Sequence, residues 1–169
     1  MSADELAAVV CLEAVLELER AAGTIRHCME QLSEEQVWRR KEGMNSVGNL
    51  MLHLAGNIRQ YFVSGVGGAA DVRERPTEFS EQGPIPKKQL MGRLEAAVNE
   101  SVAALARAKT AAELVRVRRI QSSEMTALGA IFRSLPHFRG HTQEIIHMTR
   151  EMVGDAYRFA WTPPEGKAK

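Results

Sequence analysis

The chain of 169 residues is long enough for one well-buried core, and its content of 44% hydrophobic and 25% charged residues is ordinary for a globular protein. A net charge of +1 gives no electrostatic reason to expect nucleic-acid or membrane binding, and 5% aromatic residues offer few platforms for base stacking. No uncharged apolar run approaches the ~20 residues that a membrane-spanning helix needs.

The cysteines and the amino-terminal segment favour a cytoplasmic protein. Cys11 and Cys28 fall in one predicted helix, about 25 Å apart along its axis, which is too far for a disulfide. Reduced thiols are therefore expected. Asp4 and Glu5 stand where a secretory signal would be basic, so no signal peptide is predicted. We expect one cytoplasmic domain over residues 1–169.

Capping signals and helical periodicity predict the first two long helices. A capping box at Ser2–Glu5 begins a helix that runs to about residue 32, and a second box at Ser33–Gln36 begins a short helix. The next long helix starts at Asn45 or Ser46 and ends near Ser64, where SGVGG stops it. The apolar stripe predicted for the first helix comprises Leu6, Val9, Val10, Leu16, Ile25, Cys28 and Leu32.

A long segment rich in glycine and proline, residues 67–86 (GGAADVRERPTEFSEQGPIP), is predicted to be a loop. Loops of this length are uncommon unless they have a function or cover something. A helix over 86–108 follows, and VRVRRI at 115–120 alternates like a short strand or an extended link. The last helix is predicted over 124–153, with an irregular tail through Pro163 and Pro164.

Four long helices predict an all-α fold, with a four-helix bundle as the first choice. The loop over 67–86 would act as a crossover, which allows the second and third long helices to run parallel. Pro136 falls inside the last predicted helix. Either the helix kinks there, or Ser134 caps a new helix with Pro136 in its first turn, and both alternatives stay open.

Two histidines in the stretch PHFRGHTQE lie four residues apart. This spacing puts His137 and His141 on one helical face, and they fall within the apolar stripe near Ile145 and Met148. A buried imidazole needs a partner. The pair could be core histidines satisfied by hydrogen bonds, or metal ligands that use their neutral ring nitrogens.

A third histidine, His53, lies in a polar line bordered on both edges by apolar residues. Arg59 is the only charged residue between Met44 and Ala70, so this helix cannot have a large solvated face. The pattern predicts the lining of a nearly uncharged internal pocket; the alternative is a weakly polar exposed strip. The polar line comprises Ser46, Asn49, His53, Gly56, Asn57 and Gln60.

If His53 faces the pair, the three histidines complete the ligand set of an open divalent metal centre. Asn49, Asn57 and Gln143 are then expected to orient the ligands or a substrate. Other metal patterns do not fit. There is no HExxH motif, because position 138 is Phe, and the Glu-x-x-His at 144–147 has no second copy of the kind that di-iron bundles need. His27 is isolated, and both cysteines are expected to be inert buried thiols.

Three stretches together resemble the DinB-like superfamily of metal-binding four-helix bundles: EQLSEEQVWRR, NSVGNLMLHLAGNIRQYFVSGVGG and HFRGHTQEIIHMTR. The resemblance implies an up-down-down-up bundle and a divalent metal, commonly zinc, nickel or iron, held by His53, His137 and His141. It also implies a homodimer. Some similar proteins are thiol-dependent transferases or isomerases, in which the metal activates a low-molecular-weight thiol such as bacillithiol or mycothiol.

The leading functional hypothesis is a metal-dependent enzyme, an S-transferase or a hydrolase. The metal would activate a small thiol or water for attack on an electrophilic small molecule held in the bundle pocket, and the loop over 67–86 would cover the pocket mouth. The second hypothesis is a non-catalytic metal-binding bundle with a structural or stress-related role. The third has no metal. Three imidazoles suit zinc, nickel, copper and iron alike, so the sequence does not select the metal.

Overall fold

The predicted capping boxes begin three of the helices in the computed structural model, which describes residues 1–161. In each box a serine hydroxyl accepts from the backbone N–H three residues on, and that residue's side chain accepts from the serine N–H. The helices concerned are α1 (Ala3–Gln31), α2 (Glu34–Trp38) and α3 (Val47–Ile58). Their starts are thus encoded locally. Pro163 and Pro164, in the predicted irregular tail, lie outside the described residues.

The rest of the chain adds two more long segments of helix and several short elements. The helix α3 continues as a π-helix, η1 (Arg59–Val66), whose wider turn is often found near functional sites. The other elements are α4 (Arg75–Ser80), α5 (Lys87–Arg107), α6 (Ala111–Val115), β1 (Val117–Ile120), β2 (Ser123–Thr126), α7 (Ala127–Val153) and the short 3-10 helix η2 (Gly154–Ala156).

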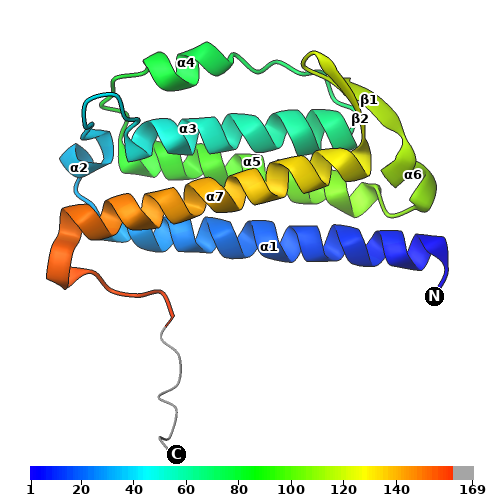
Figure 1. The fold of residues 1–169 in the computed structure, drawn as a ribbon, viewed down its shortest axis with the longest axis horizontal. Coiled ribbons are helices and arrows are strands. Elements are labelled where there is room, and N and C mark those ends of the chain that lie inside the picture. Colours follow the sequence, from blue (N-terminus) through cyan, green and yellow to red (C-terminus); the bar gives the residue numbers. More distant parts are fainter. Residues whose placement is uncertain (162–169) are drawn as a thin grey trace, which may run out of the picture.

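The long helices lie side by side, with α1 and α7 running in one direction and α3 and α5 in the other (Figure 1). The helix α1 packs against α5 and α7, and α3 packs against the same two helices. Between η1 and α5 the chain returns along α3 and carries α4 with it (Figure 1). The structure is therefore mostly helical, as the all-α prediction requires. No helix among residues 1–161 is long and apolar enough to span a bilayer.

The predicted apolar stripe of α1 is only partly the buried one. Ile25, Cys28 and Leu32 are buried, but Leu6, Val9 and Leu16 are exposed. Small residues dominate the buried face of the amino-terminal half, which allows α5 and α7 to approach the α1 backbone closely. The buried residues of α1 are Ala7, Cys11, Ala14, Leu18, Ala21, Ala22, Ile25, Cys28 and Met29.

A small antiparallel hairpin joins α6 to α7. The strands β1 and β2 pair Val117 with Thr126 and Ile120 with Ser123, which leaves a two-residue turn at 121–122. Gln121 takes a positive φ of 57° in that turn. Residues 124–126, predicted as the start of the last helix, therefore belong to a strand, because β1 supplies their backbone partners, and α7 begins only after its cap, Thr126.

Pro136 lies inside α7, which continues from Ala127 to Val153. Ser134 does not cap a new helix; its hydroxyl donates to Asn57 Oδ1 at 2.7 Å. The N–H that proline lacks would have bonded the carbonyl of Phe132. Pro136 is exposed and Phe132 is 67% exposed, so the missing hydrogen bond lies on the outward face of α7.

Candidate metal centre

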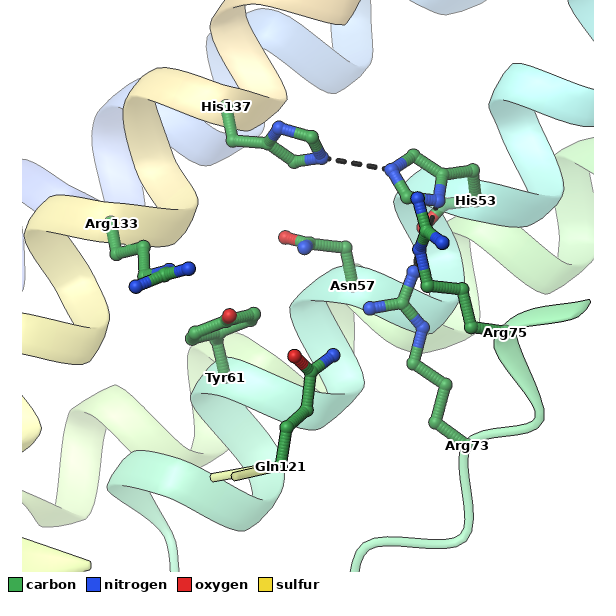
Figure 2. A pocket seen from close by; sticks show the side chains of 8 residues that line it. All are labelled: His53, Asn57, Tyr61, Arg73, Arg75, Gln121, Arg133 and His137. Carbon is green, nitrogen blue, oxygen red and sulfur yellow. Dashed lines mark hydrogen bonds between the residues drawn. The ribbon is translucent and has the colours of Figure 1, made fainter. Parts of the chain in front are cut away.

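Three histidines from two helices converge between α3 and α7. Nε2 of His53 lies 2.9 Å from Nε2 of His137 (Figure 2), and one ring nitrogen of each of His53, His137 and His141 lies within 4.8 Å of the others. His53 is buried, and the other two are half-buried. Two nitrogens each ~2.1 Å from one ion are ~3.0–3.4 Å apart at ligand angles of about 90–110°. The cluster could therefore hold a metal ion after small adjustments.

Two of these histidines have a carboxylate against the other ring nitrogen. Nδ1 of His53 lies 2.9 Å from Glu78 Oε2, and Nδ1 of His141 lies 2.7 Å from Glu144 Oε2. A carboxylate that accepts from Nδ1–H fixes the tautomer in which Nε2 carries a free lone pair, the usual arrangement behind a metal-bound imidazole. In the Glu-x-x-His motif at 144–147, Glu144 thus pairs with His141, and His147 is exposed.

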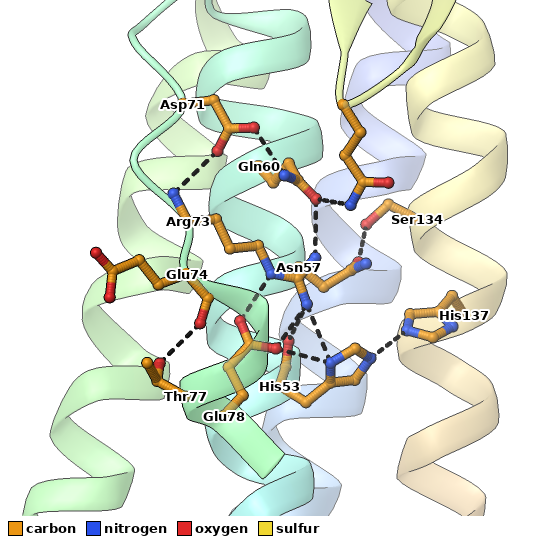
Figure 3. Close-up of polar contacts among 11 residues, drawn as sticks. His53, Asn57, Gln60, Asp71, Arg73, Glu74, Thr77, Glu78, Ser134 and His137 are labelled. Atoms are coloured by element: carbon orange, nitrogen blue, oxygen red, sulfur yellow. Dashed lines mark hydrogen bonds and ion pairs between the residues drawn. The ribbon is translucent and has the colours of Figure 1, made fainter. Parts of the chain in front are cut away.

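The carboxylate behind His53 is itself held by a buried arginine. Arg73 donates from Nε to Glu78 Oε1 at 2.7 Å and from Nη2 to Oε2 at 2.8 Å, with both side chains less than a tenth exposed (Figure 3). Burial works to raise the pKa of Glu78, but the hydrogen bonds from Arg73 and His53 and the charge of Arg73 outweigh it, and the net pKa is lowered. Glu78 is thus an ionised acceptor. Arg73 Nη2 also lies 3.0 Å from His53 Nδ1. Because the guanidinium can only donate and the carboxylate is an acceptor, the Nδ1–H of His53 donates to Glu78.

Arg73 and Glu78 belong to a segment that we call the strap, residues 71–81, which includes α4. The strap docks on the polar line of α3 and η1. Asn49 Nδ2 donates to the carbonyls of Glu78 and Glu81, each at 2.9 Å, and Gln60 Nε2 donates to Asp71 at 2.7 Å (Figure 3 shows the Gln60 contact). The polar line therefore mainly binds the strap. Of its six residues, His53 and Asn57 line the adjoining pocket. The segment 67–86, predicted to be a loop, is therefore partly helical, since it contains α4, and it covers this face of α3.

The pocket beside the histidines has a volume of about 340 Å³ (Figure 2). The prediction that it is nearly uncharged was wrong, since three arginines line it. Two of them come from the strap and one from α7, so the composition of the His53 helix alone could not reveal them. The lining residues are His53, Asn57, Tyr61, Arg73, Arg75, Gln121, Arg133 and His137.

The three residues expected to orient ligands or substrate have different places. Asn57 lines the pocket. Asn49 is buried beneath the strap and supports the segment that carries Glu78. Gln143 is exposed and does not line the pocket, because two helical residues turn the side chain about 200° away from His141. Sequence reasoning missed Arg73 and Glu78, whose only signal was a pair of opposite charges within the predicted loop.

The two cysteines do not line the pocket. Both are buried and unpaired, and desolvation raises the pKa of each thiol, which disfavours the nucleophilic thiolate. Any sulfur nucleophile at this site must therefore come from a bound molecule.

A methyl group at Gly56 would disturb the strap. Its Cβ would overlap Glu78 Oε1 and lie 3.0 Å from Arg73 Nε. We expect Gly56→Ala to lower the free energy of unfolding by about 1–3 kcal/mol, because the buried ion pair must shift. Gly92→Ala is the matched control: it lies in α5 with nothing within 4 Å of its Cβ, and should gain up to about 1 kcal/mol of helix propensity. Urea denaturation compares the two, and equal stability of both variants would contradict the docking of the strap.

The charge state of His137 predicts a pH dependence for the metal-free protein. Burial is the main cause that lowers the pKa of His137 from 6.5 to about 4, and repulsion between its protonated ring and the neighbouring histidines and the guanidinium groups of Arg73 and Arg75 adds to it. The unfolded chain therefore binds the proton first as the pH falls, so the free energy of unfolding is constant above about pH 6.5 and decreases toward pH 4.

Urea denaturation of EDTA-treated protein at about pH 7.5 and about pH 5 measures this dependence. In His137→Asn the difference between the two pH values should shrink, whereas His147→Asn, at an exposed position on the same helix, should keep it. An unchanged difference in His137→Asn would assign the pH dependence to other groups.

A family model described as "Protein of unknown function (DUF1572)" matches residues 9–166. No curated protein and no solved structure matches the chain.

Proposed function

We propose that the chain, which belongs to the DUF1572 family of proteins of unknown function, is an enzyme built on one divalent metal ion. The ion would be held by His53, His137 and His141. One observation carries the proposal. Carboxylates on Nδ1 of His53 and of His141 leave each Nε2 free for a metal, next to a third histidine and an open pocket.

The finer fold and the resemblance are part of the same proposal. An up-down-down-up four-helix bundle of the DinB-like kind is supported by the opposite directions of the α1–α7 and α3–α5 pairs and by the crossover between η1 and α5 (Figure 1). A single domain over the whole chain is proposed with it. A cytoplasmic location is supported by the two unpaired thiols.

The chemistry proposed is attack by a small thiol or water on an electrophilic small molecule. A divalent metal, when bound, lowers the pKa of a thiol or water that it coordinates. The nucleophile releases its proton to solvent, its sulfur or oxygen bonds the electrophilic atom, and the leaving group departs with the electrons of its bond. The chain contributes three neutral imidazoles, which leave coordination positions open, and the pocket holds the reacting molecule beside His53 and His137.

Elemental analysis with an activity assay tests this function. The protein, purified after growth with zinc, nickel or iron, should retain one metal ion per chain. Loaded protein should transfer a low-molecular-weight thiol to chlorodinitrobenzene or hydrolyse an activated ester, and EDTA treatment should remove the activity. Protein that holds no stoichiometric metal under any of these conditions would refute the proposal.

A non-catalytic structural role is the second candidate, and the strap favours it. His53 is tied through Glu78 to Arg73, so a metal that bridges His53 to the histidines of α7 would lock the strap and two helices together. This role predicts a large fall in melting temperature on chelation, with no turnover in the assays above. Turnover that depends on the metal would decide for the enzyme.

A homodimer is proposed from the resemblance and from an exposed apolar face. Val9 of α1 and Phe132 of α7 are 45% and 67% exposed, and both line a largely apolar groove between these helices. We expect Phe132→Ser to shift the protein from dimer to monomer in sedimentation velocity, because the dimer loses apolar contact area. Val115→Ser, at an equally exposed position on α6, should leave the dimer intact. A monomeric wild-type protein at assay concentrations would rule the dimer out.

A further inference from the structure

We propose that the pocket beside the histidines binds a small organic anion, a carboxylate or a phosphate, between Arg75 of the strap and Arg133 of α7. The inference rests on the proposed function in that it names the substrate class of the same site. It starts from the charge of the lining: three arginines and no carboxylate.

The three arginines differ in the charge that they offer. Arg73 is neutralised by Glu78 and hydrogen-bonded to Gln60. Within the described part of the chain, Arg75 and Arg133 form no ion pair, and both are exposed to the pocket mouth. Two unpaired guanidinium groups at one concavity favour an anionic ligand, since planar guanidinium matches both carboxylate and phosphate oxygens.

The two free arginines are placed on opposite sides of the opening. Figure 2 shows Arg75 beside His53 and Arg133 on the α7 side, with Asn57 and Tyr61 between them. The guanidinium of Arg75 lies 4.9 Å from the centre of the Phe79 ring, which itself packs on His53. Arg133 is one turn before His137, so its side chain lies on the helical face of the histidines. A ligand held by both arginines would thus lie against the metal centre.

Neutral hydrogen-bonding groups complete the lining. Asn57 Oδ1 already accepts from Ser134, which leaves the amide nitrogen as a donor, and the Tyr61 hydroxyl adds another. Gln121, at the tip of the hairpin, donates to the same Gln60 oxygen that accepts from Arg73, so the hairpin is tied to the strap at the pocket. The volume of about 340 Å³ lies near the lower end for small-molecule sites and suits a small anion.

Isothermal titration calorimetry at constant ionic strength tests the inference. Succinate and inorganic phosphate are the anionic probes, and succinamide is the neutral analogue of succinate. Each is titrated into metal-loaded and EDTA-treated protein. We expect saturable binding of succinate, phosphate or both, and none of succinamide; the anion that binds more tightly identifies the chemical class.

The variant Arg75→Gln/Arg133→Gln should bind the anion at least about tenfold more weakly. The matched control, Arg93→Gln/Arg107→Gln, removes the same charge from exposed positions on α5 outside the pocket and should bind as the wild type does. If the control variant lost the same anion affinity, the loss would reflect net charge alone, and the inference would be overturned. Equal binding of succinamide, or no saturable binding of either anion, would also overturn it.

Metal content separates this inference from the proposed function. If the Arg75→Gln/Arg133→Gln variant keeps its metal and loses the anion, both stand. Anion binding that depends on these arginines in a protein holding no metal leaves the inference standing and the proposed function refuted. Anion binding that disappears with EDTA but is unaffected by the arginine variant assigns the anion to the metal alone and overturns the inference.

Discussion

His53→Ala is expected to abolish stoichiometric metal binding. The substitution removes the buried ligand and leaves two histidines on one helix, which cannot surround an ion. Loss of a residue behind a ligand already costs about 10–100-fold in metal affinity, so loss of a ligand should cost more than 100-fold. Mass spectrometry of the metal content after desalting should fall from one ion per chain to a trace.

The matched control is His147→Ala, which removes an exposed histidine from α7 outside the cluster and should keep the full metal content. His137→Ala and His141→Ala should behave as His53→Ala does. Circular dichroism establishes that each variant is helical. A folded His53→Ala variant with one tightly bound metal per chain would show that the three histidines are not the ligands.

Glu78→Gln is expected to have the largest effect on stability, with a second effect on metal affinity. It removes the only ion-pair partner that Arg73 has among the described residues and leaves a buried charge uncompensated, which typically costs about 3–5 kcal/mol. It also removes the ionised acceptor for His53 Nδ1–H, which should weaken metal binding by about 10–100-fold. Urea denaturation of metal-free protein and competition with a chromogenic chelator measure the two effects.

Two comparisons make the result specific. Glu74→Gln changes the same group at an exposed position of the same strap and should leave both quantities near those of the wild type. Arg73→Gln/Glu78→Gln removes both charges, so it should recover stability relative to Glu78→Gln but not metal affinity, because His53 still lacks its carboxylate. Glu78→Gln that behaves like Glu74→Gln would mean that neither the pair nor the histidine depends on Glu78.

The parts of the structure encoded by local signals could be predicted from the sequence. Ser2, Ser33 and Ser46 satisfy backbone groups within three residues, so the helix starts could be located without tertiary information. The spacing of His137 and His141 also sufficed to place them on one face. The polar line around His53 also led to the prediction that His53 faces this pair, and the three histidines do lie close together. Most of that line, however, contacts the strap rather than an open pocket.

The errors arise where the outcome depends on distant parts of the chain. Apolar residues occur on more than one face of α1, and which face is buried depends on where α5 and α7 pack, so Leu6 and Leu16 were misassigned. Glu78 reaches His53 from 25 residues away along the chain. No periodicity links a loop carboxylate to a helical histidine, so neither this contact nor the charge of the pocket could be predicted.

The docking of the strap also fixes its alignment along α3. A shift by one residue would bring Val72 or Glu74, both exposed, to the place of Arg73, and would leave buried polar groups of α3 and η1 without partners. Burying such groups unpaired costs a few kcal/mol each, and a buried ion pair is well suited to select one register. Surface loops usually tolerate insertions and deletions. Residues 73–78 are expected to tolerate neither, because one inserted or deleted residue would separate Arg73 from Glu78 and displace both from Gln60 and His53.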